Sequence, residues 1–347
     1  MFTGTARRIG VGAVLALALL AAACSSSKST TSTGGTTGGT AGAGGTIDLV
    51  AYSTPQAAYT QIESAFQKTP AGQGVHFKQS YGASGDQSRA VAAGQPADYV
   101  NFSLAPDVTR LVKAGLVAPT WNANKYKGMV TNSVVVFVVR KGNPKHIESW
   151  SDLTKPGVSV ITPNPFSSGS ARWNIMAAYG AQLKAGKTPA EAQQYLADLF
   201  HNVSVQDSSA RNALQTFTGG KGDVLLDYEN DAIFAQQNGE SVDYVIPSQT
   251  ILIENPAAVT VKSTNPVSAK AFLAFVYTPT AQKIFADNGY RPVVPGVVPA
   301  DKFKTPAQLF TIKDLGGWTA VTASFFDPTN GIVTKIEQSN GVSTSSK

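Results

Sequence analysis

Residues 167–170, Ser-Ser-Gly-Ser, are small and rich in hydroxyl groups, and they lie where a strand pattern gives way to a helical one. Val158, Val160 and Ile161 precede them, and the helical pattern runs to Tyr179. The first backbone N–H groups of a helix lack partners within it, and that end of the helix carries partial positive charge. A small turn there can close around an anion, although serine and glycine are also ordinary capping residues. The chemistry that this run suggests is anion binding by hydrogen-bond donors.

The same order of strand, small polar turn and helix recurs three more times along the chain. The turns are residues 53–55 (Ser-Thr-Pro), 82–85 (Gly-Ala-Ser-Gly) and 207–209 (Asp-Ser-Ser). Strands that alternate with helices predict an α/β fold with mainly parallel sheets, in which turns at the carboxyl ends of the strands share a cleft. Four such turns, drawn from both halves of the chain, therefore predict one anion site.

Two long extended segments divide this α/β body. Residues 133–145 contain a continuous Val/Phe run typical of a strand buried on both faces, and residues 244–253 form the second segment. Two lobes joined by two crossing strands form a hinge around a cleft. The expected bounds are residues 46–137 and 247–335 for lobe 1, 138–246 for lobe 2, and 336–347 for a frayed C-terminus.

The N-terminal residues have the pattern of a secretion signal followed by an anchor. Residues 1–23 contain two arginines, an apolar run and three alanines directly before Cys24, the only cysteine. This order is typical of a signal peptide, and it resembles the lipobox of bacterial lipoproteins, in which the cysteine is acylated. Residues 24–45 are expected to be a lipid-anchored flexible tether, because no large apolar side chain follows the cysteine there. The sequence thus predicts an anchored protein on the outer face of the cell membrane.

Composition argues against several classes of protein. Only 14% of the residues are charged, and the 28 basic and 22 acidic residues become 26 and 22, a net charge of +4, once the signal is removed. No basic block occurs, so a nucleic-acid partner is not expected, and one cysteine rules out a disulfide framework. His76, His146 and His201 lack the spacing of metal ligands. We therefore expect a monomer without metal or cofactor.

Several motifs resemble bacterial periplasmic sulfate-binding proteins, the receptors of sulfate and thiosulfate ABC importers. The most specific is PNPFSSGSARWN at residues 163–174, and SYGASGDQ, VQDSSAR, GDVLLDYEND and LFTIKDLGGW also match. The resemblance covers about residues 47–326. It implies a two-lobed type II periplasmic binding protein fold whose interlobe cleft captures sulfate or thiosulfate. Membrane permease and ATPase subunits of an ABC importer are the implied partners.

The resemblance also implies the ligand residues. In this family, backbone N–H groups at helix starts and a few side-chain donors hold a buried sulfate without a counter-charge. The positions that match are Ser53, Ser84, Ser168, Gly169, Ser170, Ala210 and Tyr228. Tyr228 lies where the family commonly has a tryptophan whose indole N–H reaches the anion. A phenol can donate as well, but it can also accept.

Sulfate offers only hydrogen-bond acceptors, whereas phosphate at neutral pH keeps a proton and favours an acceptor in its site. Asp86 and Asp207 lie beside two of the turns, and we interpret them as helix caps or dipole partners. If either faced inward, a protonated oxyanion would fit instead. Arg172 and Arg211 are interpreted as supports that hold turn carbonyls and acids in place, in preference to direct sulfate clamps.

Other hypotheses remain open at this point. Another tetrahedral oxyanion, phosphate or molybdate, would use the same kind of site, and an anion-binding surface protein would also suit the tether. A secreted serine hydrolase would need a G-x-S-x-G elbow, which residues 82–85 do not provide, and the histidines have no evident partner. The sequence favours a binding protein over an enzyme.

Overall fold

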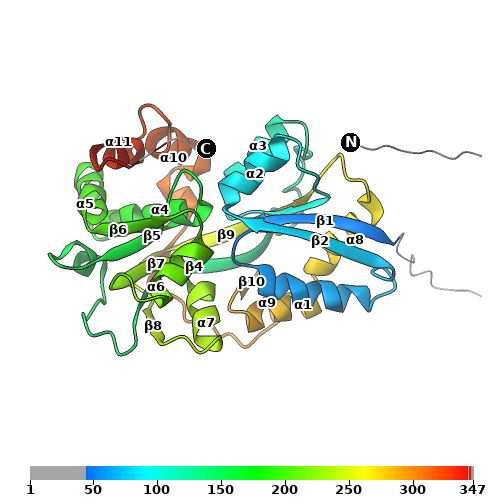
Figure 1. Cartoon of the computed structure of the whole chain (residues 1–347), viewed down its shortest axis with the longest axis horizontal. Coiled ribbons are helices and arrows are strands. Elements are labelled where there is room, and N and C mark those ends of the chain that lie inside the picture. Colours follow the sequence, from blue (N-terminus) through cyan, green and yellow to red (C-terminus); the bar gives the residue numbers. More distant parts are fainter. Residues whose placement is uncertain (1–43, 343, 345–347) are drawn as a thin grey trace, which may run out of the picture. The chain divides into compact units, whose positions relative to one another are not determined.

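The computed structural model describes residues 44–342 and residue 344. The predicted signal peptide, Cys24 and the predicted tether up to residue 43 lie outside the described residues. Within the described range, no helix is both long and apolar enough to cross a membrane. The folded body is a mixed α/β structure in which helices cover both faces of a long curled sheet (Figure 1). This confirms the α/β fold that the alternation of strands and helices predicted.

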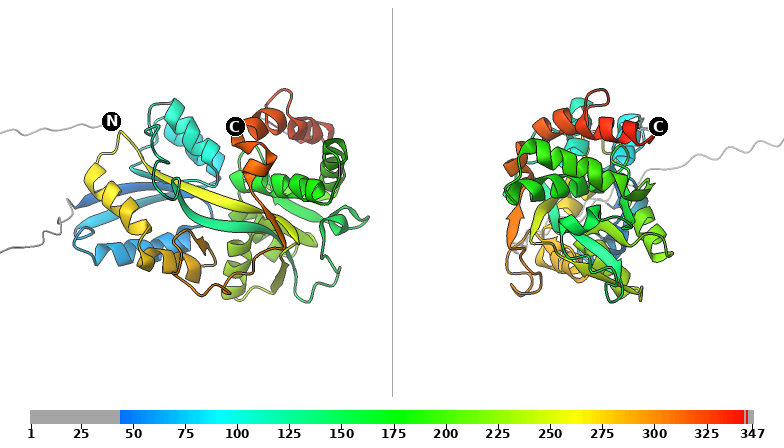
Figure 2. Two further views of the ribbon diagram at one scale, coloured as in Figure 1. Left: turned by 180° about the vertical axis from the view of Figure 1, so that it is seen from behind. Right: turned by 90° about the vertical axis from the view of Figure 1, so that its left-hand side faces the viewer.

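The first parallel group of strands lies at one end of the sheet. Its members are β1 (Gly45–Tyr52), β2 (Val75–Gly82) and β3 (Tyr99–Asn101), with β1 in the middle. The surrounding helices are α1 (Gln56–Gln67), α2 (Ser84–Ala92), α3 (Ala105–Lys113), α8 (Pro266–Val276) and α9 (Pro279–Asp287). Helices α2 and α3 cover one face of this group, and α1, α8 and α9 cover the other (Figures 1 and 2). Strand β1 begins at Gly45, within the predicted tether, because Asn265 Nδ2 and Ser268 Oγ donate to the Gly44 carbonyl at 2.7 and 3.0 Å.

The second parallel group lies at the other end of the sheet. Its members are β5 (Val160–Pro163), β6 (Val203–Asp207) and β7 (Val224–Tyr228), with β5 in the middle. Its helical elements are η1 (Trp150–Thr154), α4 (Gly169–Lys184), α5 (Pro189–His201), α6 (Ala210–Thr218) and α7 (Glu229–Gln237). The local sequence explains where these helices begin. Thr188, for example, forms a capping box with Glu191 ahead of a proline, which fixes the beginning of α5.

Two long central strands connect the groups. They are β4 (Met129–Arg140) and β9 (Gln249–Val259), which pair antiparallel with each other. The resulting strand order is β2-β1-β3-β9-β4-β7-β5-β6. Short strands complete the edges, namely β8 (Val242–Val245) and β10 (Arg291–Pro292) on β4, and β11 (Gln308–Phe310) on β9. The continuous valine run of β4 is buried on both faces of the sheet, as predicted.

The C-terminal segment packs differently from what the sequence suggested. It contains η2 (Ile312–Leu315), α10 (Gly317–Phe325) and α11 (Ile332–Ser339). Trp318 and Phe325 of α10 lie edge-on to Trp173 and Tyr179 of α4, at centroid distances of 4.7 and 4.8 Å. Because α4 is apolar almost all round, it needs cover on the side away from the sheet. Residues 317–335, which were expected in lobe 1, therefore pack on a helix of the second parallel group.

The C-terminal segment expected to fray, residues 336–347, begins inside α11. Glu337 is fully buried, and Gln206 Nε2 of β6 donates to its carboxyl group at 2.9 Å. Burial raises the pKa of Glu337 to about 7, although the Gln206 hydrogen bond lowers it. The helix is thus held to the second parallel group as far as Ser339.

Candidate functional site

The second and third predicted turns meet across the boundary between the two strand groups. Ser84 and Gly85 begin α2, and the Gly85 N–H donates to the Ser167 carbonyl at 2.9 Å. Gly169, the first residue of α4, lies against Ser103 of the β3–α3 turn. A Cβ placed on Gly169 would come within 2.7 Å of the Ser103 Oγ.

The first and fourth turns meet in the same way. Ser53 follows β1, and its Oγ accepts from the Arg211 N–H at 3.4 Å at the start of α6. The Arg211 guanidinium also donates to the Thr54 carbonyl at 3.0 Å. Turns from both strand groups therefore come face to face, at the carboxyl ends of β1, β2, β5 and β6.

The start of α4 has the properties of an anion site. Ser168 is its N-cap residue, and its side chain makes no capping hydrogen bond. The Ser168 and Ser170 hydroxyls lie 3.0 Å apart, and both residues are buried. The first turn contains no acidic residue. Buried first-turn N–H groups without a cap require another acceptor, and an anion fits their dipole.

The start of α6 offers a similar but partly occupied set of donors. Its N-cap residue Ser209 accepts from the Asn212 N–H at 3.3 Å. Ala210, the next residue, is 2% exposed, and no acidic residue follows it in the first turn. The backbone at Ala210 is thus placed at the buried edge of a second positive helix end.

Ser84 can donate to an anion through its backbone N–H, because its hydroxyl hydrogen is already bound. Its Oγ donates to the Asp107 carboxylate at 2.6 Å and accepts from the Ser103 N–H at 3.0 Å. Since the hydroxyl hydrogen is already committed to Asp107, Ser84 can donate to an anion only through its N–H group. Arg110 pairs with the same carboxylate at 2.9 Å, which holds Asp107 in place.

Ser103 lies among the candidate site residues, and sequence analysis missed it. Its Oγ lies 2.6 Å from the Tyr228 Oη, and both residues are buried. The Ser103 carbonyl accepts from Trp173 Nε1 and from Asn255 Nδ2, each at 2.9 Å. A usable signal was present, because Ser103 lies in a fifth strand-to-helix turn, just before Pro106 at the beginning of α3.

The two arginines named from the sequence bind turn carbonyls. Arg172 Nε donates to the Pro165 carbonyl at 2.8 Å, and its guanidinium lies 4.7 Å above the Phe326 ring. Burial lowers the pKa of Arg172 to about 10, and the charges of Arg89 and Arg110 add to this effect. Arg211 likewise donates to a turn carbonyl, that of Thr54.

The two acids beside the turns differ in orientation. Asp86 forms an ion pair with Arg89 of its own helix, and about half of its side chain is exposed. Asp207 is partly buried, and its Oδ2 has no hydrogen-bond partner among the described residues. Its carbonyl accepts from the Asn164 N–H at 2.8 Å, which ties the third turn to the fourth.

A buried acidic pair lies directly next to Tyr228 in the sequence. Asp227 and Asp231 are both fully buried. Burial raises the pKa of Asp231 to about 6, while Arg211, 3.6 Å away, opposes the shift. Burial and the charge of Asp231 raise the pKa of Asp227 well above its usual range. Burial and mutual repulsion therefore both disfavour two ionised carboxylates at this position.

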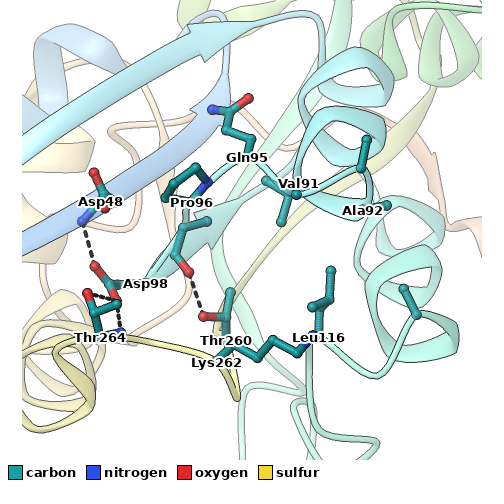
Figure 3. Close-up of a pocket in the computed structure, with 14 residues that line it drawn as sticks. Asp48, Val91, Ala92, Gln95, Pro96, Asp98, Leu116, Thr260, Lys262 and Thr264 are labelled. Atoms are coloured by element: carbon teal, nitrogen blue, oxygen red, sulfur yellow. Dashed lines mark hydrogen bonds between the residues drawn. The ribbon is translucent and has the colours of Figure 1, made fainter.

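A separate pocket of about 450 Å³ lies at the opposite, amino-terminal edge of β1 and β3 (Figure 3). Asp98 lies in the wall of this pocket, and its carboxylate accepts from the Asp48 N–H at 2.8 Å and from the Thr264 N–H at 2.7 Å. None of the predicted ligand residues lines this pocket. Among the described residues, no three potential metal-ligating side chains gather in one place.

Comparison with known proteins agrees with this geometry. The family of bacterial extracellular solute-binding proteins matches residues 47–291. A sulfate-binding protein of Synechococcus elongatus is 45% identical, over 84% of this chain and 86% of the relative. A thiosulfate-binding protein of Pseudomonas aeruginosa is 34% identical, over 80% and 88%.

Among solved structures, the sulfate-binding protein SubI of Mycobacterium tuberculosis H37Rv superimposes with a TM-score of 0.79 at 48% identity. The match covers 81% of this chain and 99% of that protein. A match over this share of both chains supports the two-lobed fold implied by the motifs. The chain therefore belongs to the bacterial extracellular solute-binding proteins, in the group of the sulfate- and thiosulfate-binding proteins.

Proposed function

We propose that this protein captures sulfate between its two strand groups, outside the cytoplasm, and delivers it to the permease of an ABC importer. The observation that carries the proposal is the buried, uncapped start of α4, which lies opposite the turns of the first strand group. The sulfate- and thiosulfate-binding relatives support the choice of ligand. The proposed ligand residues are Ser53, Ser84, Ser168, Gly169, Ser170, Ala210 and Tyr228.

Sulfate suits this set because its oxygens only accept hydrogen bonds. Helix-start N–H groups and hydroxyls can all donate to it, and no basic side chain has to contact it. Thiosulfate has the same charge and shape, with one oxygen replaced by sulfur. It is the second ligand that the proposal includes.

Closure of the two strand groups over the anion is part of the same proposal. We infer a hinge at β4 and β9, the two central strands that join the groups. Lobe 1 would contain residues 46–137 and the segment from 247 to about 311. Lobe 2 would contain residues 138–246 together with α10 and α11, because these helices cover α4.

Calorimetric titration of the purified protein with sulfate, thiosulfate, molybdate and phosphate tests the ligand. We expect tight binding of one sulfate, nearly unchanged between pH 6 and 8, and much weaker binding of phosphate. Ser168→Ala removes a proposed hydroxyl donor, so it is expected to weaken sulfate binding by roughly ten- to hundredfold. Binding of phosphate without any heat from sulfate would contradict the proposal.

We also propose that Cys24 carries the lipid that holds the protein on the outer face of the membrane. The support is its position directly after a signal-like segment. Expression with a clickable fatty acid is expected to label the wild-type chain and to leave Cys24→Ser unlabelled and soluble. Equal labelling of both chains would disprove acylation at this residue.

A further inference from the structure

We propose that Ser103 and Tyr228 act as one unit that gives the bound anion a single O–H donor. The inference rests on the proposed anion site, but it adds Ser103, which is not among the ligand positions that the resemblance implies. Tyr228 ends β7 in one strand group, and Ser103 follows β3 in the other. The unit therefore exists only where the two groups meet.

The position of the unit is fixed from several sides. Tyr228 is fully buried, and Ser103 is 1% exposed. The Ser103 backbone is held at both ends, by its N–H to Ser84 and by the two bonds to its carbonyl. The nearness of the Ser103 Oγ to the Gly169 backbone places the hydroxyl beside the start of α4.

Counting hydrogens shows what this pair can offer. Two hydroxyls carry two hydrogens, and the 2.6 Å bond between the oxygens uses one of them. Neither oxygen has another hydrogen-bond partner among the described residues. Whichever way the internal bond runs, one hydrogen remains, and an anion is the acceptor that can take it.

Single substitutions should therefore change sulfate affinity little. In Ser103→Ala the phenol is free to donate, and in Tyr228→Phe the serine hydroxyl is free. Only the double variant loses the donor completely.

The chain contains a matched control for the loss of a buried phenol. Tyr59 and Tyr99 form a buried hydroxyl pair with 2.8 Å between their oxygens, within the first strand group and its covering helix. Tyr99→Phe removes one hydroxyl from this pair and touches none of the proposed ligand residues. It is expected to bind sulfate and phosphate as the wild-type protein does.

Titration of the wild-type protein, both single variants, the double variant and Tyr99→Phe with sulfate and phosphate tests the inference. We expect each single variant to lose less than about fivefold in sulfate affinity, and the double variant to lose about a hundredfold.

The outcomes separate the two proposals. If the wild-type protein binds no sulfate, the proposed function fails. If it binds sulfate but the double variant loses only the product of the two single losses, then the paired unit is disproved. Thermal unfolding of each variant, compared with Tyr99→Phe, detects a variant that binds poorly because it does not fold.

Discussion

Replacing Gly169 by valine is expected to weaken sulfate binding by more than about a hundredfold in a chain that still folds. A Cβ at this position would lie 2.7 Å from both the Cβ and the Oγ of Ser103 and 2.8 Å from the Leu104 Cδ2. These atoms belong to the opposite strand group. Overlap of this size forces neighbours apart, and here the two groups can separate along their shared boundary. Gly169 therefore permits close approach and is not needed for an unusual backbone angle.

Gly186 provides a control with the opposite properties. Its φ is +83°, so alanine there is strained, yet a Cβ would meet nothing within 4 Å. Gly186→Ala is expected to lose about 1 kcal/mol of stability and to keep its sulfate affinity. Small-angle scattering with and without sulfate should show compaction for the wild-type protein and for Gly186→Ala, but not for Gly169→Val. Wild-type affinity in Gly169→Val would contradict the proposed closure.

Local patterns predicted the parts of the site that each strand and its following helix determine. The turns at residues 53–55, 82–85, 167–170 and 207–209 all lie at strand-to-helix junctions. Their positions follow from the general rule that parallel strands present their carboxyl ends at one edge. The buried valine run of β4 was visible for the same reason, because burial on both faces leaves a continuous apolar pattern.

Contacts between residues far apart in the chain could not be predicted in this way. Ser103 is paired with Tyr228, 125 positions later, and neither residue alone indicates the other. The cover of α4 by α10 was missed because a helix that is apolar all round gives no period to say which face needs a partner. The buried charges around Asp231 were missed because burial is a property of the assembled fold.

Those buried charges lead to the largest expected change in stability. Arg211→Met is expected to lower the free energy of unfolding at pH 8 by about 3–5 kcal/mol. Methionine can still pack on the Phe234 ring, which lies 3.9 Å from the guanidinium. It cannot offset the charge of Asp231, 3.6 Å away and fully buried, or donate to the Thr54 carbonyl. Urea unfolding at pH 5 and pH 8 measures the effect.

An exposed ion pair provides a control for the loss of one basic side chain. Lys283 and Asp287 lie 2.7 Å apart on α9, with 63% and 46% of their side chains exposed. Lys283→Met is expected to change the free energy of unfolding by less than about 1 kcal/mol at either pH. If Arg211→Met lowers the free energy of unfolding by no more than Lys283→Met does, then Asp231 is not left as an uncompensated charge.

The pH dependence follows from the sign of the Asp231 shift. Its pKa is about 6 in the folded protein, above the value of about 3.9 for an unfolded chain. Between about pH 4 and pH 6 the folded state therefore binds more protons than the unfolded state. The contribution of Asp231 to stability is complete below about pH 4, and it is lost as the pH rises through about 6. Removing Arg211 raises the folded pKa further, so the loss of stability in Arg211→Met should grow between pH 5 and pH 8.

Adding Asp231→Asn removes the titrating charge, so the double variant should recover much of the stability at pH 8 and should lose this part of the pH dependence. Equal destabilisation at both pH values, unchanged by Asp231→Asn, would mean that Arg211 acts through its bond to Thr54 alone.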